Sequence, residues 1–139
     1  MNLSIRNQLP GAVLAITHGE AMSAVRIALR GGQEITAAVT RAAVEDLGLA
    51  PGQSVTALMK ATEVALATGP VSGVSIRNQL PGTVSAIDAG TAMAAVRVAI
   101  TGGELTAAIT QDAVADLGLA AGSAVVALVK ATEVSLLAG

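Results

Sequence analysis

The chain has 139 residues, of which 53% are apolar and 13% charged, and its net charge is −2. It contains no cysteine, which excludes disulfides, thiolate metal sites and thiol catalysis. It also contains no Phe, Tyr or Trp, so it lacks the stacking platforms of single-strand nucleic-acid binders, and its acidic balance argues against a polyanion-binding surface.

Without aromatic residues, the core must be built from Val, Ile, Leu, Ala and Met. A module of about 70 residues with such a core lies near the size at which oligomerisation usually becomes necessary. We therefore expect a homo-oligomer. The N-terminus lacks the apolar stretch of a secretory signal, and no apolar run is long enough to span a membrane, so the sequence predicts a cytoplasmic protein with no membrane partner.

The sequence consists of one module written twice. Residues 4–69 align with residues 75–139 with a single one-residue gap near Gln33, and about two thirds of the aligned pairs are identical. The segment that joins the copies is rich in Gly, Pro and Ser, which is typical of a linker. The sequence thus predicts a first module at residues 1–69, a linker at 70–74 and a second module at 75–139.

Gly and Pro divide each repeat into short pieces with β-strand propensity. In the first repeat these are residues 3–7, 12–17, 21–29, 34–40, 54–60 and 63–67. One helix is predicted from Arg41 to Leu47, because Thr40 can cap its N-terminus and Gly48 can take the left-handed conformation that ends it. Pro51 and Gly52 then form a turn, and the second repeat follows the same plan.

Short strands with one brief helix in fewer than 70 residues predict an all-β fold of two tandem OB-like, five-stranded antiparallel barrels. An open sandwich is the alternative. The predicted strand at residues 54–60 is apolar on both faces, and residues 124–129 are more so. A strand of this kind should be covered by another module or subunit.

Two sequence motifs concentrate hydrogen-bond donors. The segment Ser4-Ile-Arg-Asn-Gln-Leu-Pro-Gly11 recurs at residues 75–82, and Lys60-Ala-Thr-Glu-Val64 recurs at residues 130–134. Four of the eight basic residues lie in these motifs. If the segments are extended, Ser4 and Arg6 share one face, and Glu63 points away from the face of Lys60 and Thr62.

This set of donors suits a tetrahedral dianion, which needs several N–H and O–H groups and limited positive charge around its oxygens. A bare metal cation would instead require carboxylates or imidazoles, which the motifs mostly lack. Each motif alone is explained as well by solvated charges and a turn. The conjunction of both motifs, twice and at nearly equal separation, favours an oxyanion site.

With these motifs the sequence resembles the molbindins, the Mop-type molybdate-binding proteins, and specifically their di-Mop members with tandem Mop/TOBE-type modules. The resemblance rests on Ser-x-Arg-Asn at Ser4 and Ser75, on Ala-Ala-[Val/Ile]-Thr followed by a helix that ends in Asp-Leu-Gly-Leu, and on the closing Lys-Ala-Thr-Glu-Val. It implies OB-like modules, a homotrimer, and molybdate bound at interfaces between modules, with tungstate as a competing ligand.

The resemblance further implies that the Ser-x-Arg-Asn segment and the Lys-Ala-Thr segment of a neighbouring module face the same anion. The implied oxyanion-binding residues are Ser4, Arg6, Asn7, Lys60, Ala61, Thr62, Ser75, Arg77, Asn78, Lys130, Ala131 and Thr132. A further anion on the threefold axis is implied at the turn of Gly90, Thr91 and Ala92. The first repeat carries Glu20 at this turn, and three such charges near an axis would repel a dianion.

The sequence predicts no enzymatic activity, because no nucleophile, base and orienting group come together and the lone His18 is absent from the second repeat. The predicted function is intracellular binding, storage and buffering of molybdate. The alternative is an oxyanion-dependent regulatory module acting on a transporter or transcription partner. An oligonucleotide-binding OB protein is disfavoured by charge and composition. We also expect cross-strand ion pairs of Arg26 with Glu34 and of Arg97 with Glu104.

Overall fold

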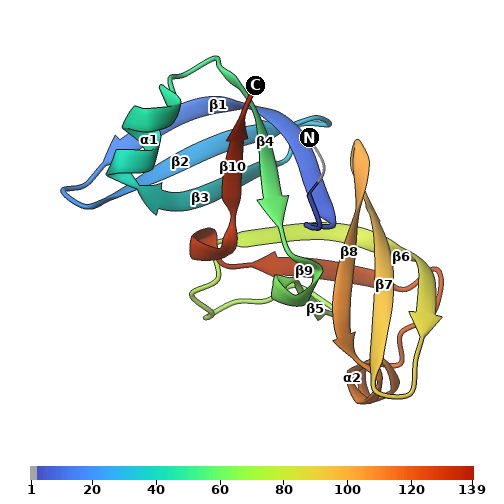
Figure 1. The fold of residues 1–139 in the computed structure, drawn as a ribbon. Helices are drawn as coiled ribbons and strands as arrows, with labels where there is room; N and C mark the ends of the chain where they lie inside the picture. Colours follow the sequence, from blue (N-terminus) through green and yellow to red (C-terminus); the bar gives the residue numbers. More distant parts are fainter. Residues whose placement is uncertain (1–2) are drawn as a thin grey trace.

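The computed structural model describes residues 3–139 as two five-stranded antiparallel sheets, each strongly curled, with one short helix beside each (Figure 1). The first repeat forms β1 (Asn7–His18), β2 (Met22–Leu29), β3 (Glu34–Thr40), α1 (Arg41–Leu47), β4 (Ser54–Met59), the 3-10 turn η1 (Ala61–Glu63) and β5 (Ala65–Ala67). The second forms β6 (Asn78–Ala89), β7 (Met93–Ile100), β8 (Gly103–Thr110), α2 (Gln111–Leu117), β9 (Ala124–Val129), η2 (Ala131–Glu133) and β10 (Ser135–Ala138). The predicted all-β class with one helix per module is confirmed.

The two repeats exchange their last strands. The strand order is β10-β4-β1-β2-β3 in one sheet and β5-β9-β6-β7-β8 in the other, so each sheet takes four strands from one repeat and the fifth from the other. Ser135 pairs with Leu58, and Ala65 pairs with Leu128. In Figure 1 the red β10 accordingly lies beside the green β4. The sequence did not predict this exchange, and the module limits drawn from the repeat stay a prediction.

The exchange explains why strands β4 and β9 are apolar on both faces. Leu58, on the second apolar face of β4, is only 6% exposed, and its counterpart Leu128 in β9 is 8% exposed. Each of these strands lies between a strand of its own repeat and one of the other. The second apolar face of β4 and of β9 is therefore covered by the other repeat of the same chain.

The N-terminal strand differs from the sequence prediction, which was wrong in placing a strand at residues 3–7 and a break at Pro10. Ser4 and Arg6 form bends, and β1 begins at Asn7 and runs through Pro10. The backbone nitrogen and carbonyl of a strand residue point to the same side. The carbonyl of Pro10 accepts from the N–H of Arg30 at 3.2 Å, so the proline nitrogen, which has no hydrogen to donate, also faces β2 and not β4. The ladder with β2 starts only at Gly11, so no ladder bond is lost.

Gly11 allows β1 and β2 to approach closely at the point where the ladder starts. A Cβ at this position would lie 2.5 Å from the carbonyl oxygen of Ala28, and Gly82 stands in the same relation to Ala99 O. Any other residue would push the strands apart. The glycine therefore permits the tight curl of the sheet.

The predicted helices are confirmed together with their caps. The N–H of Ala43 donates to Oγ1 of Thr40 at 3.1 Å, and Gly48 ends α1 with φ of 62°. Thr110 and Gly118 do the same for α2. No helix within residues 3–139 is long and apolar enough to cross a membrane.

Candidate oxyanion-binding site

Strand register brings the two donor motifs of the first repeat together. Asn7 pairs with Met59 at the last step of the β1–β4 ladder, so the preceding Arg6 and the following Lys60 leave the sheet side by side. Both line a hollow of about 270 Å³. Its lining consists of Ser4, Ile5, Arg6, Lys60, Ala61 and Thr62. The hollow is thus built from the two predicted segments, both of which come from the same repeat.

The local conformation of these segments differs from the extended one that the sequence suggested. Ser4 and Arg6 are bends, and Ala61 to Glu63 form a 3-10 turn. The alternation of a strand therefore does not apply, and Glu63 is not part of the lining of this hollow. Glu63 instead lines a second hollow together with Thr62 and Lys130.

This second hollow, of about 180 Å³, lies where the two repeats meet. Asn78 pairs with Val129, which places Arg77 beside Lys130 just as Arg6 lies beside Lys60. The second repeat contributes Ile76, Leu128, Lys130 and Glu133 to the lining, and the first contributes residues 62–65. The two Lys-Ala-Thr segments are therefore neighbours across the junction between modules, and Thr62 lines both hollows.

A carboxyl pair lies in the junction hollow. A hydrogen bond that protonated Glu133 donates to the Glu63 carboxylate raises the pKa of Glu133 above its ordinary value of 4.5. Partial burial and the negative charge of Glu63 raise this pKa further, and the ammonium of Lys130 opposes the shift. The sequence did not predict this pair, because the two residues are 70 positions apart and meet only through the strand exchange.

The raised pKa makes stability depend on pH. A carboxyl whose pKa is higher in the folded state stabilises the fold at low pH and loses this contribution as pH rises through the raised value.

We therefore expect Glu133→Gln to raise the melting temperature at pH 7, because its amide can donate to Glu63 without a second charge. The gain should disappear below the ordinary glutamate pKa of 4.5. Thermal unfolding from pH 4 to 8 measures it, with the exposed turn variant Glu20→Gln as control. A lower melting temperature of Glu133→Gln at pH 7 would contradict this.

The predicted ligands Asn7 and Asn78 have their side chains turned to the opposite module. Nδ2 of Asn7 donates to the carbonyl of Thr106 at 2.8 Å, and its Oδ1 accepts from the Thr106 N–H at 2.7 Å. Asn78 binds Thr36 with the same two distances. Both asparagines are buried, and each satisfies the open edge of an outer strand, β8 or β3. One amide donor and the acceptor oxygen of each are therefore engaged in holding the modules together.

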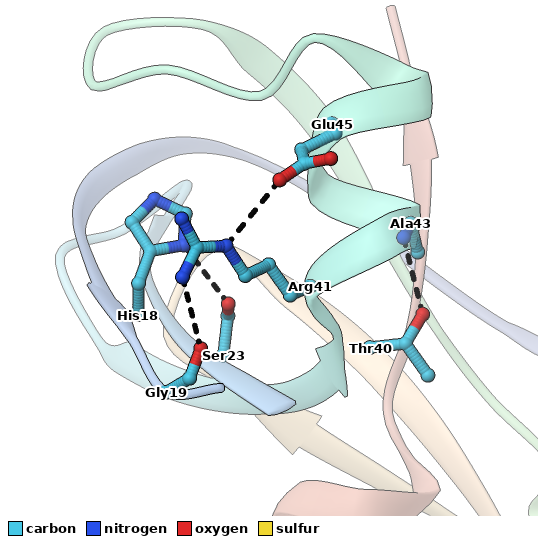
Figure 2. A network of polar contacts seen from close by, with 7 residues as sticks. All are labelled: His18, Gly19, Ser23, Thr40, Arg41, Ala43 and Glu45. Atoms are coloured by element: carbon cyan, nitrogen blue, oxygen red, sulfur yellow. Dashed lines mark hydrogen bonds and ion pairs between the residues drawn. The ribbon is translucent and has the colours of Figure 1, made fainter. Parts of the chain in front are cut away.

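The turns considered for an axial anion differ between the repeats. In the first, Arg41 donates through Nη1 to Gly19 O at 3.3 Å and through Nε to Glu45, while His18 bonds Ser23 at 3.0 Å (Figure 2). In the second, the counterparts of this network are Ala89, Ala94 and Gln111, and Gly90, Thr91 and Ala92 are exposed. The positive charge of Arg41 thus lies at the turn that carries Glu20. The preference for the second turn as an axial site stays a prediction.

One of the two expected cross-strand ion pairs is present. Nη2 of Arg26 lies 2.8 Å from Oε1 of Glu34. In the second repeat Glu104 instead accepts a hydrogen bond from Ser85, and no ion pair of Arg97 occurs among residues 3–139. No group of three His, Cys, Asp or Glu side chains in the same range could hold a metal ion.

The fold and the first hollow define a class of protein with two strand-exchanged OB-like modules and a donor-rich hollow suited to a small anion. The chain belongs to the TOBE domain family, whose model matches residues 3–66 and 74–136. This confirms the resemblance to tandem Mop/TOBE-type modules.

Relatives of known function are similar along nearly the whole chain. The molybdenum-pterin-binding protein MopA of Rhodobacter capsulatus is 38% identical over 138 residues, and the molybdenum transport protein ModE of Herbaspirillum seropedicae is 38% identical over 136. These matches cover 98% and 96% of this chain but only 52% and 51% of the relatives. The chain therefore spans about half the length of these relatives.

A solved structure is similar over its full length. The cytoplasmic molybdate-binding protein ModG, in a crystal form with molybdate bound, superimposes with a TM-score of 0.97 at 40% sequence identity. The match covers 100% of both chains. Hence the arrangement of both modules, and not only the single module, is shared with ModG.

Proposed function

We propose that this protein binds, stores and buffers molybdate in the cytoplasm without catalysing a reaction, with tungstate as a competing ligand. The observation that carries the proposal is the hollow in which the segment Ser4–Arg6 meets Lys60–Thr62. It offers hydroxyl, guanidinium and ammonium donors and no carboxylate, which matches the needs of a tetrahedral dianion. The likeness to ModG over the whole chain supports molybdate as the anion.

The corresponding segments of the second repeat form the second proposed site. Its proposed ligands are Ser75, Arg77, Lys130, Ala131 and Thr132. We keep Asn7 and Asn78 among the ligands only through their backbone and their remaining amide N–H, because the rest of each side chain binds the other module. The turn of Gly90 to Ala92 is proposed as an additional, axial site.

The assembly we propose is a homotrimer. Its support is the set of large apolar side chains that one chain leaves exposed, among them Leu14 at 42%, Met22 at 46% and Met93 at 48%. Burial of such residues against copies of the same chain is the usual way to cover them. Light scattering at micromolar concentration tests this proposal, and a stable monomer would contradict it. No nucleic-acid or membrane partner is proposed.

The decisive test is the double variant Lys60→Ala/Lys130→Ala. Each substitution removes a charge-assisted hydrogen bond of roughly 1.5–3 kcal/mol. We therefore expect molybdate affinity to fall at least about tenfold at each affected site, as measured by calorimetric titration.

The matched control is Arg30→Ala/Arg41→Ala, which removes the same charge from exposed residues outside the hollows and should retain wild-type affinity. Unchanged affinity and stoichiometry in a folded lysine double variant would show that the sites lie elsewhere.

Wild-type protein should bind molybdate and tungstate with similar strength and sulfate much more weakly, because donors held for long metal–oxo bonds cannot contract fully around a smaller ion.

A second candidate function is regulation, in which a partner protein recognises the molybdate-loaded form. The observation that favours it is the match to half of ModE, a molybdenum transport protein in Herbaspirillum seropedicae and a transcriptional regulator in Yersinia pestis. A pull-down that recovers a transporter or transcription component only in the presence of molybdate would support regulation. Recovery that does not depend on molybdate would count against it.

A further inference from the structure

A third hollow, on the outer face of the second sheet, shares only Arg6 with the two donor motifs. Its volume is about 350 Å³, and its lining is Arg6, Asp88, Ala95, Arg97 and Thr106. Four of these residues belong to strands β6, β7 and β8, and Arg6 precedes β1 of the other module. The hollow thus exists only because the two modules are packed together.

The backbone of Arg6 is held near this hollow by the neighbouring residue. Asn7 is buried and bonded twice to the backbone of Thr106, so the start of β1 is held against β8. Figure 1 shows the blue start of β1 beside β8. Arg97 pairs with Thr106 across the β7–β8 ladder and therefore lies on the same part of the sheet. The small side chain of Ala95 also lines the hollow.

The guanidinium of Arg97 is free to bind a ligand because its expected partner is engaged elsewhere. In the first repeat, Glu34 holds Arg26 at 2.8 Å. In the second repeat, Oε2 of Glu104 accepts from Oγ of Ser85 at 3.1 Å, and Ser85 stands where the first repeat has Leu14. One difference between the repeats thus leaves Arg97 without an ion pair in the part of the chain that the structure describes.

We propose that this hollow is a further, open oxyanion site that accepts tetrahedral oxyanions whatever their central atom, sulfate and phosphate included. Two guanidinium groups can each bind an oxyanion through two parallel N–H bonds, and the Thr106 hydroxyl adds a donor. The carboxylate of Asp88 leaves one net positive charge from the three charged groups that line the hollow. Because the arginines are exposed, binding is weak, screened by salt and unselective.

The test is a titration of the full chain with sodium sulfate, followed by amide chemical shifts at low and constant ionic strength. We expect saturable shifts at Ala95, Arg97 and Thr106 in the wild type. Arg97→Ala should weaken sulfate binding about fivefold, as expected for the loss of an exposed ion pair worth about 1 kcal/mol. Arg26→Ala is the matched control, because it removes the equivalent arginine of the first repeat, which Glu34 already binds, and it should behave as the wild type.

A second variant tests the electrostatics of the hollow independently of Arg97. Asp88→Asn removes the carboxylate that opposes an anion and should tighten sulfate binding. The proposal is overturned if Arg97→Ala and Arg26→Ala bind sulfate equally, if Asp88→Asn weakens binding, or if the wild-type shifts do not saturate. Lys60→Ala/Lys130→Ala should retain these sulfate shifts, so failure of the molybdate sites and failure of this site can be told apart.

Discussion

Replacing Leu136 by Asp in β10 will destabilise the sheet of the first repeat, although Leu136 belongs to the second. Leu136 pairs with Ala57 of β4 and packs against the core, so the substitution places a charge among apolar side chains. We expect a loss of about 3 kcal/mol in the free energy of unfolding, in the range of large substitutions in cores. Hydrogen exchange should locate the effect, with protection lost first at Val55 to Leu58.

The reciprocal substitution, Leu66→Asp in β5, serves as the matched control. Leu66 pairs with Ala127, so protection should be lost first in β9, in the second half of the chain. The crossed pattern distinguishes exchanged strands from strands that close their own repeats. Loss of protection in β9 upon Leu136→Asp would contradict the exchange.

The second large effect is expected for Asn7→Ala and Asn78→Ala. Each substitution removes two hydrogen bonds and leaves the backbone N–H and carbonyl of one threonine, Thr106 or Thr36, without partners at the edge of the other sheet. A lost hydrogen bond costs about 1 kcal/mol and an unsatisfied buried group about 1–3 kcal/mol, so we expect a loss of about 3 kcal/mol for each variant. Denaturant unfolding measures this loss.

Gln8→Ala provides the control for the asparagine variants. Gln8 is exposed and makes a single side-chain hydrogen bond, to Ile5 O, so its replacement should change stability little. If Asn7→Ala were as stable as Gln8→Ala, the asparagine would not hold the modules together. The side chain of Asn7 would then be available as an anion ligand.

Local features of the fold could be predicted from the sequence. The caps of α1 depend on Thr40 and Gly48, which act on neighbouring backbone groups, and the prediction was confirmed. The break at Pro10 was wrong because its outcome depends on where the ladder with β2 begins, which is a tertiary property. A proline in the sequence is compatible both with a break in the strand and with a continuous strand that is unpaired on one side.

The exchange of strands could not be predicted, because the repeats are so similar. Strands β5 and β10 have similar side chains, with Leu66 in the first and Leu136 in the second. The strands that they can pair with, β4 and β9, also have corresponding sequences. The pattern of apolar residues is therefore satisfied by either pairing. The choice depends on the path of the chain through η1 and η2, for which the sequence has no separate signal.

Part of the candidate site followed from residue types alone. Four of the hollow's lining residues, Ser4, Arg6, Lys60 and Thr62, were recognised by their donors, and strand register brings them together. The role of Asn7 was hidden, because its partner is a backbone group 99 residues away. Donor chemistry predicts what a side chain can bind but not which of several acceptors it will find.

The exchanged strands have a consequence for how folding depends on protein concentration. A chain with one such repeat would find the partner of its last strand only in a second molecule, so its folding would become more complete as concentration rises. In this chain the segment 68–77 connects both repeats, which makes the strand exchange a unimolecular step. A short tether raises the effective concentration of the second partner to the millimolar range. The duplicated chain can therefore complete both sheets even when only a few copies are present.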